Sequence, residues 1–495
     1  MRKLFFFIST FVLTFTFAQN TSSLTFKESA EYRDEVKTNN ILSIHTTTSG
    51  QTGIIRDSKK NILFDIFDKD LNKVFSKVVK SSKKETFVGE LFFNDEIKFF
   101  TEYASNKTER TIYCHIFNIK EQSLKKVTLF ETTVNKNESL FWGKKKRLTN
   151  IAISPDGNYV AISTDDIKKD VNSYTIRVFN ANTLDIVYTK AYQEDAERYY
   201  EHNDMSVDNE ATVYSLGKLF LEGRKQKKKG EANYEFILNR ITENENKQIN
   251  IKLDEDHIQS LNISSINNEI HLLGFFSEKR AGRIKVGCNF IIDTDQFTVK
   301  EKRAFNLPSQ VYEDLYGYRK AKRKDDKELS GFSVDYVLYD SQGNTYILAE
   351  EFYITSQYIY NGNMGGYWSY TYHYDDILIL KFSAAGELSW GRSIFKRATS
   401  PSYNAFIKDD KLHVILNSGK NLSEKEDGRT KASKGWFEST ALFDFVYTAD
   451  GKVSYDKIQD NKGKTMYIPF YGTFENDSFI MMSDGRTKKQ FMILQ

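Results

Sequence analysis

Residues 151–162, IAISPDGNYVAI, are two short apolar runs on either side of a polar turn. Residues 175–188, TIRVFNANTLDIVY, repeat this arrangement with a turn of Asn and Ala residues. Asn, Asp and Gly adopt the backbone angles that tight turns demand, so each stretch predicts a β-hairpin. Together the two hairpins predict a unit of four short antiparallel strands.

The same four-stranded unit recurs along the chain. Counterparts of the first hairpin turn at residues 94–96, 208–210, 267–269, 341–344, 408–411 and 476–477. Counterparts of the second turn at residues 68–70, 120–122, 243–245, 293–295, 384–386 and 449–451. Units of this size, repeated at intervals of roughly 45 to 65 residues, are typical of a β-propeller, because blades bury their faces only against each other. Stacked β-sandwiches need long crossovers that this hairpin order does not offer. Helical periodicity is nearly absent outside residues 310–328.

The number of units predicts how the ring closes. Units begin near Ile41, Glu85, Leu148, Asp204, His257, Phe332, Tyr403 and Met466. The last unit has only three strands before Gln495, and the stretch Ser23–Lys27 can supply the fourth. We therefore predict an all-β fold, a β-propeller of eight four-stranded blades whose last blade is closed by the N-terminal strand. Seven blades are the alternative, because the first unit is short.

The composition and the N-terminus predict an exported, single-domain protein. With 40% hydrophobic and 14% aromatic residues but only 2 Cys and 4 Pro, the composition is that of neither an intrinsically disordered protein nor a small disulfide-rich domain. Arg2 and Lys3, the apolar stretch 4–17 and Ala18 form a secretory signal. Its apolar core is shorter than the roughly 20 residues that span a bilayer. We expect cleavage after residue 18, a propeller over residues 19–495, and a soluble periplasmic or extracellular monomer without a membrane span.

Charge and residue spacing limit the chemistry. The 70 basic and 67 acidic residues leave a formal charge of +3, which disfavours nucleic acid as a partner. Cys114 and Cys288 lie in separate apolar runs and are expected to be buried free thiols, although a bridge between neighbouring strands stays open. His271 and His413 lie inside strand patterns, where a structural role is expected. The sequence contains no phosphate loop or calcium loop, so we predict no cofactor and no metal.

Long connections are expected on one face of the ring. In an antiparallel blade, the second and fourth connections of each repeat lie on the face opposite the first and third. All of the long segments are second or fourth connections. They are residues 134–147, 193–204, 222–232, 277–285, 306–331, 352–376 and 419–435. Loops on a rigid scaffold usually carry binding, so we expect binding on this long-loop face rather than mere drift in loop length.

Two features of the long-loop face suggest binding residues. Four basic runs, at residues 144–147, 224–229, 279–285 and 319–324, favour an anionic partner, although a solvated charge run is the plainer explanation of each. In residues 352–376, FYITSQYIYNGNMGGYWSYTYHYDD, tyrosines alternate on both sides of a Gly-rich tip. An extended hairpin would present them as a stripe, whereas a folded-down hairpin would seal the channel. The candidate binding residues are Tyr358, Tyr360, Tyr367, Trp368, Tyr370, Tyr372, Tyr374, Arg224, Lys225, Lys227, Lys228, Lys229, Arg280 and Arg283.

Two stretches resemble known propellers. Residues 153–161, ISPDGNYVA, resemble the blade signature of TolB-like and WD-repeat propellers. Residues 376–381, DILILK, followed by the Gly386-to-Trp390 hairpin, resemble a blade repeat of exported propeller proteins of Bacteroidetes. The Tyr-rich insertion before them is similar to uncharacterised secreted proteins of those bacteria. The resemblance implies an exported propeller and brings no activity with it.

The sequence therefore predicts binding rather than catalysis. It has no Gly-x-Ser-x-Gly motif and no sialidase-type Asp box, and we name no catalytic residue. We predict a non-catalytic exported binding or scaffold protein that recognises a protein or polysaccharide of the cell envelope through the long-loop face. The alternative is a glycan-acting hydrolase or lyase with carboxylates in the mouth of the axial channel.

Overall fold

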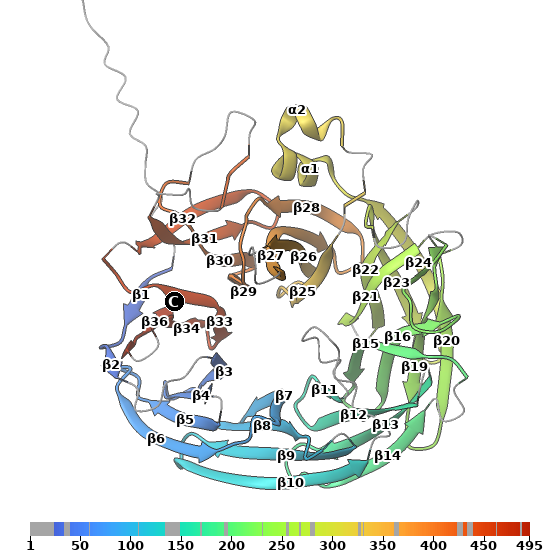
Figure 1. Cartoon of the computed structure of the whole chain (residues 1–495), viewed down its shortest axis with the longest axis horizontal. Coiled ribbons are helices and arrows are strands. Elements are labelled where there is room, and N and C mark those ends of the chain that lie inside the picture. Colours follow the sequence, from blue (N-terminus) through green and yellow to red (C-terminus); the bar gives the residue numbers. More distant parts are fainter. Residues whose placement is uncertain are drawn as a thin grey trace, which may run out of the picture.

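Each predicted unit forms one antiparallel sheet in the computed structural model, and eight such sheets surround a central axis (Figure 1). The predicted eight-bladed propeller is therefore confirmed, and the alternative of seven blades is wrong. The structure describes residues 24–495 except 34–39, 59, 107, 134–148, 169–170, 193–196, 230, 254–256, 267–268, 278–282, 325–327, 330, 361–365, 423–428, 433–438, 462 and 486–487. The predicted signal sequence lies outside the described residues.

The blades follow one another in chain order. Blades 1 and 2 contain β3 (Asn40–Thr46), β4 (Thr52–Ser58), β5 (Asn61–Phe67) and β6 (Lys73–Lys80), then β7 (Glu85–Phe93), β8 (Glu96–Tyr103), β9 (Glu109–Asn118) and β10 (Ser123–Thr133). Blades 3 and 4 contain β11 (Thr149–Ile153), β12 (Tyr159–Lys168), β13 (Val171–Asn180) and β14 (Ile186–Tyr192), then β15 (Tyr200–Val207), β16 (Val213–Phe220), β19 (Tyr234–Ile241) and β20 (Asn246–Ile251). Blade 4 thus begins four residues earlier than the predicted Asp204.

Blades 5 and 6 contain β21 (His257–Ile266), β22 (Glu269–Ser277), β23 (Val286–Asp293) and β24 (Thr298–Asn306), then β25 (Phe332–Tyr339), β26 (Thr345–Tyr360), β27 (Gly366–Phe382) and β28 (Leu388–Ile394). Blades 7 and 8 contain β29 (Tyr403–Lys408), β30 (Lys411–Gly419), β31 (Thr440–Tyr447) and β32 (Val453–Asp460), then β33 (Tyr467–Glu475), β34 (Ser478–Ser483) and β36 (Phe491–Leu494), with β1 (Phe26–Glu28). Two small ribbons pair β17 (Lys227–Lys228) with β18 (Glu231–Ala232) and β2 (Tyr32–Arg33) with β35 (Lys488–Lys489).

The N-terminal strand closes the ring, as the sequence predicts. β1 pairs antiparallel with β36, so that Phe26 lies opposite Leu494 and Glu28 opposite Met492. Beyond this pairing, the backbone N–H groups of Thr25 and Gln495 donate to each other's carbonyl oxygens at 2.9 Å. The first and last parts of the chain therefore share one blade.

Apolar residues from both faces of each sheet form the core between neighbouring blades. Leu216, Leu238 and Leu272, for example, are fully buried in one cluster that joins blades 4 and 5. This burial explains why the second and third strands of each blade are nearly continuous apolar runs, since both of their faces are covered. The inner strands contact each other in order around the axis, and β33 contacts β3.

Short turns on one face lock neighbouring blades together, and we call this the short-turn face. Asn94 and Asp95 form a two-residue turn with φ of 51° and 61°, as tight hairpins require. Across blades, Asn209 Oδ1 accepts a hydrogen bond from the Asp156 N–H at 3.1 Å, and Ser341 Oγ lies 2.9 Å from Asp410 Oδ2. The short-turn face thus has a structural role.

The opposite, long-loop face bears the larger connections. Two helices, α1 (Ser309–Tyr316) and α2 (Tyr318–Ala321), lie in the connection from blade 5 to blade 6, where the sequence allows some helix. Arg392 of β28 holds α1 through Asp314, with Nε 2.7 Å from Oδ2. Among the described residues, no helix has the length and apolarity needed to cross a membrane.

Candidate functional site

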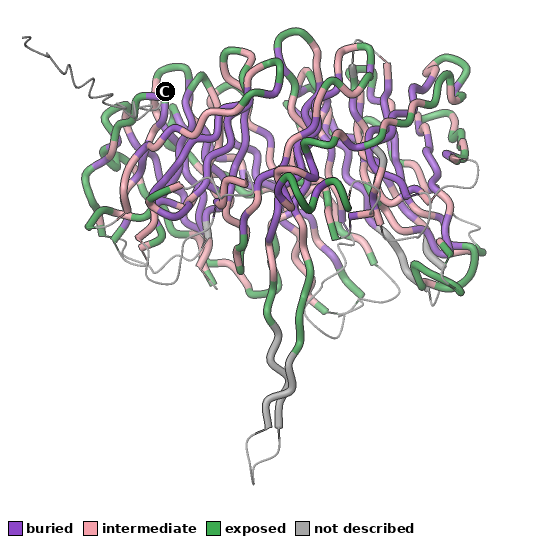
Figure 2. Tube along the Cα trace, turned by 90° about the horizontal axis from the view of Figure 1, so that it is seen from above, coloured by how far each residue is buried: buried purple, intermediate pink, exposed green. Residues whose placement is uncertain are grey.

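The most prominent feature of the long-loop face is the hairpin of β26 and β27. These strands have 16 and 17 residues, and their distal halves stand clear of the ring (Figure 2). The alternative that this hairpin folds down to seal the channel is therefore wrong. The Gly-rich tip at residues 361–365 lies outside the described residues, and of residues 357–360 and 366–370 only the backbone is described.

The register of the hairpin defines two faces. Phe352 pairs with Tyr374, Ile354 with Tyr372, and position 358 with position 368. Because directly opposed residues lie on the same side of a ribbon, these pairs share one face, which we call the aromatic face. The pairs Tyr353–His373 and Thr355–Thr371 share the other face. Of the predicted stripe, the described side chains of Tyr372 and Tyr374 lie on this aromatic face.

The described side chains of the two faces differ in chemistry. On the aromatic face, Ile354 and Tyr372 are 42% and 46% exposed, and beneath them the rings of Phe352 and Tyr374 are 4.9 Å apart. On the other face, Tyr353 stacks on His373 at 4.4 Å, and Thr355 Oγ1 lies 2.9 Å from His373 Nε2. Both faces are open to solvent, but Ile354 and Tyr372 make one of them largely apolar, whereas the other carries a polar network.

Buried charges anchor the base of the hairpin. A β-bulge between Glu350 and Phe352 turns Glu350 toward Lys396, whose Nζ lies 2.7 Å from Glu350 Oε1 and 2.6 Å from the Tyr374 carbonyl. Asp376 accepts hydrogen bonds from the Lys396 N–H and from Arg397. Such a paired cluster fixes the direction in which the hairpin leaves the ring, since separating buried charges is costly.

The pKa values of this cluster reflect its burial. Desolvation raises the pKa of Asp376 to about 7, although Arg397 opposes the shift and Glu351 adds to it. Desolvation also raises the pKa of Glu350 and lowers that of Lys396, even though these two groups pair with each other. Of these groups, Asp376 is the one whose pKa burial brings close to neutral pH.

A cavity of about 240 Å³ adjoins the base of the hairpin. Glu351 and Asp376 line it from blade 6, Tyr316 and Lys324 from the helical connection, and Arg283 from blade 5. Desolvation raises the pKa of Glu351 as well, so two carboxyl groups with raised pKa values share this space.

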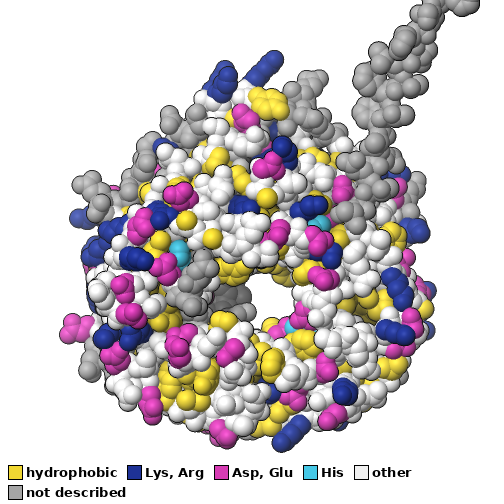
Figure 3. Space-filling view, turned by 180° about the vertical axis from the view of Figure 1, so that it is seen from behind, with side chains coloured by type: hydrophobic (Ala, Val, Ile, Leu, Met, Phe, Trp, Pro, Cys, Tyr) yellow, Lys and Arg dark blue, Asp and Glu magenta, His cyan; other side chains and the backbone are white. Residues whose placement is uncertain are grey.

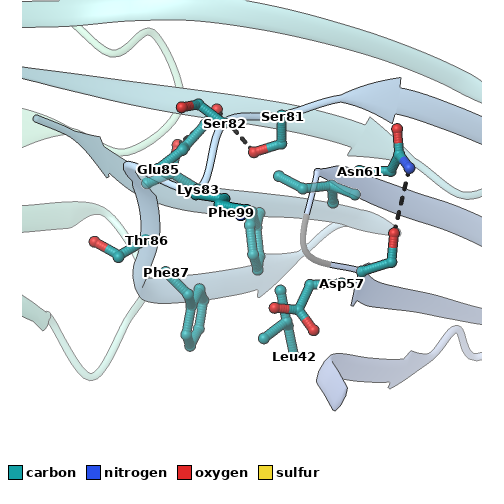
Figure 4. Close-up of a pocket in the computed structure, with 13 residues that line it drawn as sticks. Leu42, Asp57, Asn61, Ser81, Ser82, Lys83, Glu85, Thr86, Phe87 and Phe99 are labelled. Carbon is teal, nitrogen blue, oxygen red and sulfur yellow. Dashed lines mark hydrogen bonds between the residues drawn. The ribbon is translucent and has the colours of Figure 1, made fainter. Parts of the chain in front are cut away.

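A larger cavity of about 520 Å³ lies between blades 1 and 2 (Figure 4). Its apolar wall contains Phe87 and Phe99, whose rings stack at 4.7 Å. Glu85 Oε1 lies 2.8 Å from Thr101 Oγ1, 3.1 Å from His115 Nε2 and 3.2 Å from Lys126 Nζ. Burial alone would raise the pKa of Glu85, but these three partners lower it to about 2. Glu85 is thus a fixed, compensated charge in the cavity wall.

Carboxylates of the inner strands join blades to each other. An opening passes through the centre of the ring (Figure 3). Around it, Asp204 Oδ2 accepts from the Ile263 N–H at 2.8 Å, and Asp335 Oδ2 accepts from the Tyr403 hydroxyl at 2.9 Å. The first bond joins blade 4 to blade 5, and the second joins blade 6 to blade 7. These two carboxylates bond to neighbouring blades. A glycan-acting enzyme, the alternative, would instead need two carboxylates that face the same substrate.

The predicted basic residues do not gather at one place. Arg283 lines the cavity at the hairpin base, whereas the run 224–229 belongs to blade 4. There Arg224 lies over the Tyr199 ring at 4.5 Å, and Lys228 pairs with Glu222, while Lys225, Lys227 and Lys229 are exposed. Arg280 lies outside the described residues. Nearer the hairpin, α2 and its surroundings expose Arg319, Lys320, Lys322 and Arg323.

The sequence interpretation missed the residues at the base of the hairpin. Asp375 and Asp376 follow the Tyr-rich stretch inside an apolar strand, and Lys396 follows another strand. A charged residue inside a buried strand pattern indicates a paired cluster, because an unpaired buried charge is unstable. This signal was available, although it does not show which charges meet.

Thiols and metal ligands have no evident role in a site. Cys114 and Cys288 are free and buried, as the sequence predicts, and burial raises the pKa of Cys114 to about 12. His413 Nδ1 pairs with Asp444 Oδ2 at 2.8 Å, and His271 Nδ1 lies 3.1 Å from Asn289 Nδ2, so both histidines have the predicted structural role. In the described part of the chain, no group of three or more His, Cys, Asp or Glu residues could hold a metal ion.

Comparisons with known proteins assign no function to the chain. No protein-family model and no curated protein matches the sequence. Among solved structures, the chain is similar to the polysaccharide lyase Uly1, with TM-score 0.40, 8% identity, and coverage of 91% of this chain and 89% of the lyase. It is also similar to an acylaminoacyl peptidase of Pyrococcus horikoshii, with TM-score 0.38, 8% identity, and coverage of 89% and 57%. The β-propeller fold is shown by the eight four-stranded sheets of the chain itself.

Proposed function

We propose that the protein is an exported, non-catalytic binding protein whose projecting hairpin holds a partner protein with an acidic surface. The observation that carries the proposal is the open aromatic face of the hairpin, with Ile354 and Tyr372 both exposed away from the ring. Monomeric proteins rarely keep such apolar groups on an extended projection unless a partner covers them.

The chemistry of this face favours a protein over a glycan. Ile354 adds an aliphatic surface to the aromatic positions, and rigid aromatic side chains with apolar neighbours are typical of the centre of protein interfaces. The opposite face holds the two strands of the ribbon together, because Tyr353 stacks on His373 and donates to Asp375 Oδ2, and Thr355 hydrogen-bonds His373. A preformed ribbon loses little conformational freedom on binding.

Charge next to the hairpin favours an acidic partner. The helical connection, which shares the 240 Å³ cavity with the hairpin base, exposes Arg319, Lys320, Lys322 and Arg323. A partner whose apolar groove is flanked by carboxylates would match both features, and its binding would weaken at high salt.

Photo-crosslinking from the two faces of the hairpin tests the proposal. A photoreactive phenylalanine analogue would replace Tyr372 on the aromatic face or, as the matched control, Thr371 on the other face. We expect position 372 to attach to one acidic protein in the native envelope, and position 371 to attach to it weakly. Equal attachment from both positions, or attachment only to polysaccharide, would overturn the proposal.

A second candidate function rests on the smaller cavity. Glu351 and Asp376 line it together, and raised carboxyl pKa values are typical of the acid in a glycan-cleaving hydrolase or lyase. Asp376→Asn and Glu351→Gln would then each abolish glycan cleavage, and Glu351→Gln, which lies outside the anchoring pairs of Asp376, would leave attachment from position 372 unchanged. Glycan cleavage that survives both substitutions would exclude this cavity as its site.

A further inference from the structure

The cavity between blades 1 and 2 has the size of a small-molecule site and is separate from the hairpin on blade 6. Its volume of about 520 Å³ falls within the range of roughly 300–1,000 Å³ that ligand pockets occupy. It opens on the long-loop face, because Ser58 ends β4 and Asn61 begins β5 there, and Ser81 to Lys83 lie in the connection between blades 1 and 2.

The cavity has one apolar wall. Leu42, Ile62, Phe87 and Phe99 contribute to it, and the ring of Phe87 is half-buried, with Phe99 fully buried behind it. The two rings are nearly parallel, with an interplanar angle of 19°. An aromatic ring that is held in place by a second ring behind it suits a flat, partly apolar face of a ligand.

The remaining wall carries neutral hydrogen-bonding groups. Hydroxyl groups and one amide line it, from Ser58, Asn61, Ser81, Ser82, Thr86 and Thr101. Some of these groups are held in place, since Ser81 Oγ donates to Glu85 Oε2 at 3.1 Å and Asn61 Nδ2 donates to Ser58 Oγ at 3.3 Å (Figure 4). Donors and acceptors fixed in this way favour a ligand with several hydroxyl groups.

Charge in the cavity is balanced. His115 and Lys126 compensate Glu85, and the lining also contains Asp57 and the exposed Lys83. Asp57, Leu42, Phe87 and Phe99 all line this cavity (Figure 4). A carboxylate in the lining can accept from adjacent hydroxyls of a ligand whose ring packs on the aromatic surface.

We infer that this cavity binds a neutral saccharide of one or two rings. A sugar ring combines an apolar C–H face, which suits Phe87, with an edge of hydroxyl groups, which suits Asp57 and the hydroxyl-rich wall. The balance of charge disfavours a strongly acidic or basic ligand. The charged side chains of the cavity already compensate each other, so the charge of such a ligand would lack an opposite charge to pair with.

Calorimetric titration of the signal-free chain with glucose, galactose, N-acetylglucosamine, cellobiose and chitobiose tests the inference, with glucuronic acid as the charged comparison. We expect at least one neutral sugar to bind with a Kd below about 10 mM, and at least about tenfold more tightly than glucuronic acid. Absence of binding by all five neutral sugars, or tighter binding of glucuronic acid, would overturn it.

Substitutions then assign the binding to the cavity. Asp57→Asn and Phe87→Ala should each weaken binding at least about tenfold. Phe474→Ala is the matched control, because Phe474 is also a partly buried inner-strand residue stacked on a buried ring, that of Phe406 at 4.4 Å. Binding that survives both cavity substitutions would place the sugar elsewhere. If Phe87→Ala unfolds the protein, the isosteric Asp57→Asn variant alone decides.

Discussion

His45 of blade 1 hydrogen-bonds Glu475 of blade 8 through Nδ1, across the seam where the ring closes. Its Nε2 lies 3.2 Å from Oε1 of Glu90 on blade 2, and its ring stacks on Phe92 at 4.7 Å. One histidine therefore joins the inner strands of three blades. The seam is held at the axis by these side chains and at the rim by the pairing of β1 with β36.

This seam should weaken at alkaline pH. Burial alone would lower the pKa of His45, but hydrogen bonds to Glu475 and Glu90 raise it from 6.5 to about 9. A raised pKa in the folded state means that the contribution to stability is complete below pH 6.5 and is lost as pH rises through 9. We expect His45→Gln to cost about 1.5–3 kcal/mol near pH 6 and to flatten the fall in melting temperature between pH 7 and pH 10. His257→Gln on blade 5 is the control. A fall in melting temperature between pH 7 and pH 10 that His45→Gln leaves unchanged would contradict the prediction.

Closure by the N-terminal strand should depend on Leu24 and not on Phe26. Leu24 is 5% exposed and packs in the cluster of blades 7 and 8, whereas Phe26 is 47% exposed. Leu24→Ala should therefore destabilise the protein by about 2–5 kcal/mol, and Phe26→Ala by less than about 0.5 kcal/mol. Chemical denaturation measures both. Equal effects of the two substitutions would show that the strand contributes through its backbone alone.

Asp376 should make the protein more stable in mild acid than at neutral pH. Desolvation raises its pKa to about 7, so the folded state binds a proton that the unfolded state has released, and this contribution is lost as pH rises through 7. Asp376→Asn should reduce the decline in melting temperature between pH 5 and pH 8. A steeper decline in the variant would mean that the pairing with Arg397 outweighs the burial of the carboxyl group.

The aromatic face of the hairpin should carry partner binding without carrying stability. Ile354→Ser with Tyr372→Ser removes two exposed groups, so the melting temperature should change little while partner affinity falls by at least about tenfold. Thr371→Ala is the control on the other face, outside the contact between Thr355 and His373, and should leave affinity nearly unchanged. Affinity is measured by titration with the crosslinked protein once it has been purified. Loss of folding in the first variant would instead indicate a structural hairpin.

Local sequence was sufficient for the strands and turns. Asn94-Asp95, Asp409-Asp410 and Asn476-Asp477 adopt positive φ in two-residue turns, which these residue types tolerate better than others. The predicted starts of most blades agree with the structure, since period-two apolar patterns and turn residues act over a few neighbours along the chain. The number of repeats then determined the number of blades.

Contacts between distant residues could not be predicted in this way. His45 and Glu475 are 430 positions apart, and Glu85 and His115 are 30 apart, yet each pair meets because blades close or strands pair in a given register. Acidic and basic residues are frequent throughout the sequence, so their types alone do not show which of them pair.

The sequence by itself determined a ring of eight blades, its closure by the N-terminal strand and the concentration of long connections on one face. Only the tertiary structure decided that the Tyr-rich hairpin projects from the ring and that Asp376 and Arg397 anchor it. It also decided that Asp57 and Phe87 border one cavity. The reason is physical: backbone propensity and apolar periodicity are local, whereas cavities and charge pairs arise where separate strands are packed against each other.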